Sequence, residues 1–397
     1  MKKILSVMLI LAMVFCFAAC GSDNGSEAEG TEDVVKVGMV CIGNDNMAYD
    51  RNFYMAADAA KEILATEGIN IEWEYKYDNP VEVADDCAEL ADDGCIAVFC
   101  NSYGQEPQML ITAQDYPDAL FIGMTNETSK SDSLDNTVNT FPSIFEGRYL
   151  AGVAAGLKLN EMIESGKITA EQAVMGYVGA FPYAEVKSGY TSFYLGAKYI
   201  CPSVTMKVVY TNSWFDIALE KEAAEKLIKD GCVLISQHAD SEGAPKACEA
   251  AGVPNVAYNI DTSSIAPTTA IISSRINWTP YYKLAIAATV KGEAFANDWC
   301  GTIATDSVLL TELHNAADGT AEKIDEVKAQ LDAGTLHVFD TATFTVDGKV
   351  LDSYMADVDT DDEFTPDHEA IKDGYFAESD LRTRQIADIQ SVALRSW

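Results

Sequence analysis

The feature that most constrains the fold of this chain is a regular alternation of short apolar runs with longer amphipathic stretches. The strand-like runs cover residues 34–42, 71–77, 96–99, 120–124, 174–178, 205–209, 233–236 and 256–258. The helix-like stretches cover residues 50–66, 81–93, 105–116, 144–163, 184–199, 217–230, 244–251 and 321–333. This spacing is typical of right-handed βαβ crossovers, so the sequence predicts an α/β fold with parallel sheets covered by helices.

The alternation stops at a long apolar helix over residues 144–163 and then starts again, which predicts two lobes. We expect an N-terminal lobe over residues 34–150, to which a segment from about 260–305 returns. The second lobe is expected over residues 151–260, with part of 306–397, a region of strands, acidic loops and one helix that crosses back between the lobes. Lobes of this size fit ordinary domains.

The first twenty residues have the pattern of an export signal. Lys2 and Lys3 precede an apolar run over residues 4–17, and small residues lead to Cys20. We therefore predict a signal peptide over residues 1–19 and lipidation of Cys20, which resembles the cysteine of a bacterial lipobox. A plain secretory signal with an incidental cysteine is the alternative. Residues 20–33 are polar and small, as in a flexible tether, so the protein is expected at the outer face of the cell membrane.

Charge and composition exclude several classes of function. The formal net charge of −35 repels phosphate backbones, so we expect no nucleic-acid partner. The cysteines lack CxxC spacing and fall mostly in apolar patterns, as expected for small buried hydrophobic residues. The chain has four widely spaced histidines, and we predict neither a metal site nor a cofactor.

Candidate binding residues lie in the loops that follow the predicted strands. In open parallel sheets, ligands bind outside the carboxyl ends of the strands. Aromatic rings and carboxylates collect in these loops, a combination that suits a planar ligand with N–H or O–H donors. Asp50 is also well placed to be the N-cap of the first helix, and Asp216 of a later one. The candidate ligand-binding residues are Tyr49, Asp50, Phe181, Trp214, His238, Asp240, Asp261 and Trp278.

Catalytic patterns are weak. His238, Asp240 and Ser241 are triad residue types, but they are crowded on one loop, whereas a triad normally draws on separate segments. The sequence contains no GxSxG, Walker A or HExxH motif. We therefore predict a binding protein with no catalytic residues.

Five blocks of sequence resemble the basic membrane protein family of ABC-transporter substrate-binding lipoproteins, also called Med or purine-nucleoside-receptor-like. The resemblance runs from about residue 35 to about residue 380. The blocks are FEGRYLAG (145–152), YVGAFPYAEVKSGYTSFYLGAKYICP (177–202), NSWFDIALEKEAAEKLIKDG (212–231), QHADSEGAPKACEAAGV (237–253) and SSRINWTPYY (273–282).

The resemblance implies the type I periplasmic-binding-protein fold, two Rossmann-like lobes joined by crossover strands, and an ABC permease as partner. It implies capture of a purine nucleobase or nucleoside, with adenine favoured. By the same resemblance Tyr49 and Trp214 flank the base, and Asp240 and Asp261 face its polar edge or a sugar. The chain departs from the family pattern at NMAYD (46–50), Arg275, Trp278 and Glu242-Gly243, which leaves the exact ligand open.

Three alternatives remain at this point. The same loops could serve a surface nucleosidase, a sensory lipoprotein that signals to a partner protein, or a receptor for another flat ligand such as riboflavin.

Overall fold

A computed structural model of the protein describes residues 34–44, 47–77, 82–124, 134–182, 184–340, 342–344 and 389–393. The predicted signal peptide, Cys20 and the tether lie outside these residues. Among the described helices, none combines the length and the apolar character that crossing a bilayer requires.

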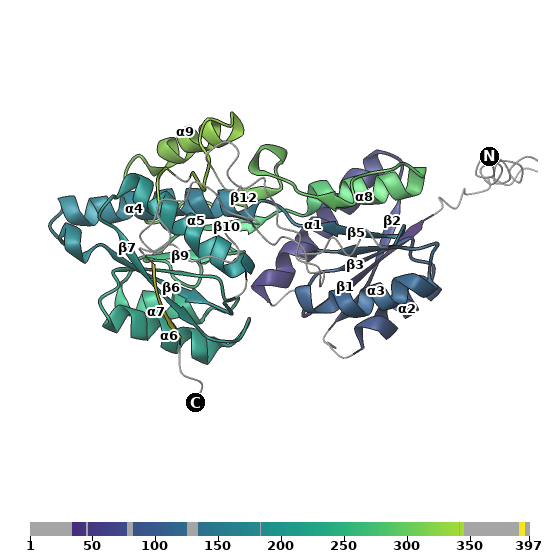
Figure 1. The fold of residues 1–397 in the computed structure, drawn as a ribbon, viewed down its shortest axis with the longest axis horizontal. Helices are drawn as coiled ribbons and strands as arrows, with labels where there is room; N and C mark the ends of the chain where they lie inside the picture. The colour runs from purple at the N-terminus through teal and green to yellow at the C-terminus, as the bar shows by residue number, and fades with distance from the viewer. Residues whose placement is uncertain are drawn as a thin grey trace, which may run out of the picture. The chain divides into compact units, whose positions relative to one another are not determined.

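The elements form two parallel-sheet lobes within one compact unit (Figure 1). The first sheet has the order β11-β5-β4-β3-β1-β2, and every pairing in it is parallel. Its strands are β1 (Val35–Cys41), β2 (Ile71–Tyr77), β3 (Ala97–Cys100), β4 (Leu120–Gly123), β5 (Thr137–Thr140) and β11 (Asp298–Trp299). Its helices are α1 (Ala48–Thr66), α2 (Val83–Asp92), α3 (Glu106–Asp115) and α8 (Thr279–Lys291).

The second sheet has the order β12-β10-β9-β8-β6-β7-β13, and it is parallel except for the antiparallel pair of β10 with β12. Its strands are β6 (Val174–Gly179), β7 (Thr205–Tyr210), β8 (Leu234–Gln237), β9 (Asn255–Tyr258), β10 (Ala270–Ile276), β12 (Val308–Leu310) and β13 (Ile389–Ala393). Its helices are α4 (Ile144–Glu164), α5 (Ala184–Ile200), α6 (Ile217–Lys229), α7 (Gly243–Ala251) and α9 (Thr320–Asp332).

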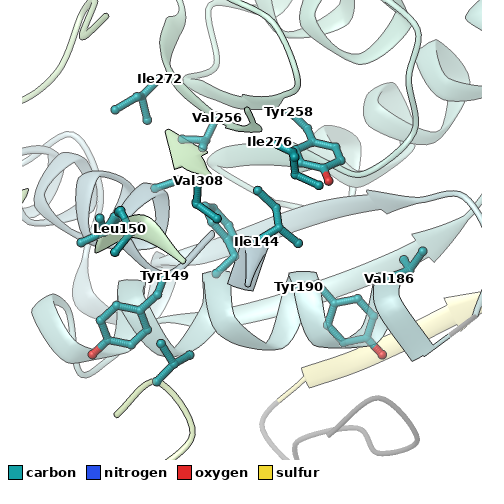
Figure 2. Close-up of a cluster of buried hydrophobic side chains, with 14 of the residues drawn as sticks. Ile144, Tyr149, Leu150, Val186, Tyr190, Val256, Tyr258, Ile272, Ile276 and Val308 are labelled. Carbon is teal, nitrogen blue, oxygen red and sulfur yellow. The ribbon is translucent and has the colours of Figure 1, made fainter. Parts of the chain in front are cut away.

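Each sheet is covered on both faces. α1 and α8 pack on one face of the first sheet, and α2 and α3 on the other (Figure 1). In the second lobe α4 and α5 cover one face, and α6 and α7 the other. Figure 2 shows the core beneath α4, where Ile144 and Leu150 meet Val256, Ile276 and Val308 of the sheet. This arrangement confirms the predicted α/β class with two lobes.

Small residues let α4 and α5 pack closely. A Cβ atom built on Gly152 would lie 2.1 Å from the carbonyl oxygen of Phe193, and one on Gly196 would lie 2.0 Å from that of Tyr149. Both distances are far below van der Waals contact, so the two helix backbones touch where these glycines lie.

The structure differs from the predicted elements in a few places. Strand β10 (Ala270–Ile276) is not among the predicted strands, because the buried serines at 273 and 274 weaken its apolar pattern. Helix α8 and the short strands β5, β11, β12 and β13 were not predicted as individual elements either. The proposed lobe limits stay predictions, but sheet membership assigns α4 and β10 to the second lobe and α8 and β11 to the first.

The cysteine interpretation is confirmed for seven of the eight cysteines in the described residues, which are free and buried. Cys300 is exposed.

Candidate functional site

The candidate site begins where β1 and β3 end. The side chain of Asp50 is 0% exposed, and its Oδ1 accepts hydrogen bonds from the Gly43 backbone N–H (3.2 Å) and the Asn101 amide (2.8 Å). The Tyr49 hydroxyl donates to the carbonyl of Asn101. Asp50 Oδ2, in contrast, is buried and has no hydrogen-bond donor among the described residues. A buried acceptor without a donor costs free energy, which a ligand N–H or O–H would recover.

Burial also changes the ionisation of this carboxyl group. It raises the pKa of Asp50 from 3.8 to about 6, although the hydrogen bonds from Asn101 and Gly43 oppose the shift. The N-cap interpretation of Asp50 is wrong, because α1 begins at Ala48 and has Met47 at its N-cap. Asp50 therefore lies inside the first turn and points to the loop after β1.

A second group of acidic residues lies at the carboxyl ends of β7 and β8. The Asp240 N–H donates to the carbonyl of Trp214 at 2.9 Å, which holds the two loops together. Glu220 lies behind them and accepts from the N–H groups of Ser241 (3.0 Å) and Asp216 (3.1 Å). Asp216 caps α6, as predicted, by accepting from the first N–H groups of that helix.

These carboxyl groups are also poorly solvated. Burial, followed by the charge of Glu220, raises the pKa of Asp240 well above its usual range. Burial raises the pKa of Glu220 from 4.5 to about 7. Carboxyl groups held close together in a region shielded from water disfavour an anionic ligand and suit one that donates hydrogen bonds.

A chain of amide hydrogen bonds joins the two lobes at this point. The Asn52 amide on α1 donates to Asn259 Oδ1 at 3.2 Å, and the Asn259 amide donates to Asp240 Oδ1 at 2.9 Å. Asn259 follows β9 and has a φ of 69°, a left-handed conformation that asparagine tolerates better than most residues. Asn52 Oδ1 is buried and has no donor among the described residues. The junction therefore offers a second unused acceptor.

Aromatic rings surround these polar groups. Phe181 and Trp214 have ring centroids 5.6 Å apart, and Trp214 lies 6.4 Å from the His238 ring. On the first lobe Tyr49 packs against Phe53 at 4.9 Å. Tyr49, Phe181 and Trp214 are half-buried residues.

Sequence reasoning missed a buried network beneath the rings. Arg148 on α4 is 0% exposed and donates to the Gln237 carbonyl and to His238 Nδ1, both at 3.1 Å. Its guanidinium lies 3.7 Å from the centroid of the Tyr258 ring. Because arginine is always a donor, Nδ1 of His238 is the acceptor, and Nε2–H donates to Glu185 at 2.6 Å. The sequence signal was an arginine among the apolar and small residues at the start of a helical stretch.

Two of the predicted site residues lie at the margin of this group: Trp278 reaches Tyr49 only through Phe53, and Asp261, within the described part of the chain, contacts none of the other seven. Trp278 is 1% exposed and stacks on Phe53, with centroids 5.1 Å apart and planes at 24°. Asp261 is exposed and contacts His314 at 2.8 Å and the Ser263 N–H at 2.7 Å. The ligand roles assigned to all eight residues remain predictions.

A cavity of about 280 Å³ lies elsewhere, between β12 and α9. Its lining is mainly aliphatic and includes Ile272, Ile303, Leu310 and Ile324. It contains none of the predicted ligand-binding residues, and we assign no ligand to it.

Two α/β lobes with parallel sheets, joined near their strand ends by the Asn52–Asn259 hydrogen bond, have the architecture of the periplasmic-binding-protein fold. Residues 35–334 match the family model described as Bmp, ABC transporter substrate-binding protein PnrA-like. The chain therefore belongs to the Bmp family and is the substrate-binding protein of an ABC transporter, a class that works outside the cytoplasm.

Relatives agree with this assignment. A purine-binding protein of Brucella abortus is 29% identical over 79% of this chain and 85% of its own length. A protein of Haloferax volcanii that is named as an ABC transporter glucose-binding protein is 29% identical over 73% of this chain and 70% of its own. The crystal structure of an ABC transporter solute-binding protein from Aeropyrum pernix matches the fold with a TM-score of 0.64 and 15% identity, covering 77% of this chain and 93% of that one.

Proposed function

We propose that this protein captures a purine nucleobase or nucleoside, with adenine favoured, between its two lobes and delivers it to an ABC permease. The observation that carries the proposal is Asp50 Oδ2, a buried carboxylate oxygen at the junction of the lobes to which none of the described residues donates a hydrogen bond. An exocyclic amine or a ribose hydroxyl supplies the missing donor. Asn52 Oδ1 and the carboxyl group of Asp240 add further acceptors.

The aromatic residues would recognise the flat face of the base, as the acceptors would recognise its donor groups. Tyr49 and Trp214 come from opposite lobes, and a flat base between them would gain stacking on both faces. The name of the Brucella relative supports a purine. The name of the Haloferax relative makes glucose the competing ligand, because sugar hydroxyls also donate to carboxylates. Riboflavin is a third flat candidate.

Thermal denaturation of the protein from Val34 onward, which forms one compact unit, tests the ligand class. We expect adenine, guanine or their nucleosides to stabilise the fold by about 2.7 kcal/mol at about 100 times the dissociation constant. Glucose and riboflavin, the two competing ligands, are tested in the same assay at the same concentrations. A shift with glucose and none with any purine would reject the purine assignment and leave the receptor class standing.

The enzyme and sensor alternatives require separate measurements. Incubating a nucleoside with the protein and assaying free base distinguishes a receptor, which returns intact nucleoside, from a nucleosidase. Uptake of labelled purine is compared in cells with and without the gene. Reduced uptake without the gene indicates import, and unchanged uptake indicates signalling. We also propose membrane attachment through lipid on Cys20, which Cys20→Ala should abolish when membrane and soluble fractions are compared.

A further inference from the structure

Asp261, one of the candidate ligand residues, forms a cluster with Glu312 and His314 on the second lobe. Each offers one ligand atom, and the three atoms all lie within 4.8 Å of one another. His314 Nε2 and Asp261 Oδ2 are 2.8 Å apart although the residues are separated by 53 positions in the chain. That separation explains why the sequence predicted no metal site.

The backbone holds both halves of this cluster in place. The Ser263 N–H occupies Asp261 Oδ1 at 2.7 Å, which leaves Oδ2 directed at the histidine. The His314 N–H donates to the carbonyl of Ile271 at 2.8 Å, in the same strand β10 that follows the Asp261 loop. His314 is therefore attached to the sheet by a main-chain hydrogen bond, and Thr311, the neighbour of Glu312, donates its N–H to the carbonyl of Ser273 at 2.9 Å.

The donor set has the chemistry of a metal site. Two carboxylates approach one imidazole, and among the described residues neither carboxylate has an ion pair with a lysine or arginine. A divalent cation would relieve their mutual repulsion. The imidazole nitrogen favours a transition metal such as zinc over magnesium or calcium, which prefer all-oxygen sites. Three protein ligands leave a fourth position for water.

We propose that Asp261, Glu312 and His314 bind one divalent transition-metal ion, with zinc as the preferred ion. The ion replaces the direct contact between His314 and Asp261 and draws Glu312 in as the third ligand. Asp261 follows Asn259 by two residues, so the ion also fixes the loop that carries Asn259 to the junction of the lobes.

Calorimetric titration of zinc into the purified, chelator-treated protein tests the site. All proteins compared carry Cys300→Ser, because the exposed thiol would otherwise compete for zinc. We expect one ion per chain and at least tenfold weaker binding in His314→Ala. Glu312→Gln should also bind more weakly, and it preserves the shape of the side chain. His337→Ala, a histidine outside the cluster, should bind like the parent.

Two results would overturn the proposal: no saturable binding at millimolar zinc, or equal affinity in the parent and in His314→Ala. Cobalt(II) spectra give an independent readout, since nitrogen and oxygen ligands produce no thiolate charge-transfer band. Neither measurement uses a purine, so the result for the metal site is independent of whether the protein binds purines. Circular dichroism of each variant checks that the fold is retained.

Discussion

Replacing Asp50 by asparagine should make the folded protein more stable at neutral pH and weaken its binding of ligand. The folded-state pKa of Asp50 is about 6, against 3.8 for the ordinary side chain. A raised acid pKa means that the folded state holds its proton more tightly than the unfolded chain. The associated stability is fully present below about pH 3.8 and is lost as the pH rises through about 6.

The size of the effect follows from the shift. The pKa difference, from 3.8 to about 6, is worth about 3 kcal/mol at 1.36 kcal/mol per unit. We therefore expect the parent to lose about 3 kcal/mol relative to Asp50→Asn between about pH 4 and about pH 8. Urea denaturation of both proteins at the two pH values measures this difference. Because Glu220 and Asp240 also titrate, the comparison uses the difference between the two proteins.

At neutral pH, Asp50→Asn should gain stability relative to the parent but bind purine more weakly. The asparagine amide can keep the contacts of Oδ1, but it presents an N–H donor where Oδ2 stood, so a ligand N–H would meet another donor. We expect purine binding at neutral pH to weaken about tenfold or more. In the parent, affinity should also fall as the pH drops below about 6, because a protonated Asp50 accepts poorly. Parallel pH profiles of stability for the two proteins would refute this account of Asp50.

Three further variants test the rings, the buried network and the helix packing. Trp214→Ala should weaken purine binding by about 1–3 kcal/mol, about 5- to 150-fold, whereas the exposed neighbour Phe215→Ala should leave calorimetric affinity unchanged. Arg148→Met should lower the free energy of unfolding by about 1–3 kcal/mol in urea, because the buried Gln237 carbonyl loses the hydrogen bond from Arg148, whereas His238 Nδ1 keeps its contact with the Tyr177 hydroxyl. Gly196→Ala should cost about 1–3 kcal/mol or more, because its Cβ would lie 2.0 Å from the carbonyl oxygen of Tyr149.

Controls and contrary outcomes are specific to each variant. Equal affinity losses in Trp214→Ala and Phe215→Ala would indicate a general disturbance of the loop and contradict stacking. An Arg148→Met protein as stable as the parent would show that the network contributes nothing net. Gly104→Ala, at a position with open space around the added carbon, should not share the destabilisation of Gly196→Ala.

The fold was predictable because periodicity reports local structure. Helix α1 and strand β6 lie within two residues of their predicted bounds, since each has a clear apolar pattern. Strand β5 was missed because its sequence, TVNT, is short and polar, and β11 has two residues. Such strands form because a neighbouring strand already supplies hydrogen-bond partners, which sequence pattern does not reveal.

The candidate site was predictable in part. The rule that ligand residues follow strands located Asp240 and Trp214, which the structure brings together through a main-chain hydrogen bond. It could not foresee that Asp261 contacts His314, because that contact depends on how a distant segment returns to the sheet. It also overlooked Arg148, which lies on a helix and reaches the site from beneath.

The shared position of Asn259 has a consequence for how binding proceeds. Its bond to Asp240 lies within one lobe, whereas its bond to Asn52 crosses to the other. If the lobes move apart, the Asn52–Asn259 bond breaks. The Asn259–Asp240 bond remains, so Asp240 keeps its position on the second lobe. A ligand that enters the open protein then binds side chains that are already ordered. Less entropy is lost on binding, so more of the contact energy contributes to affinity.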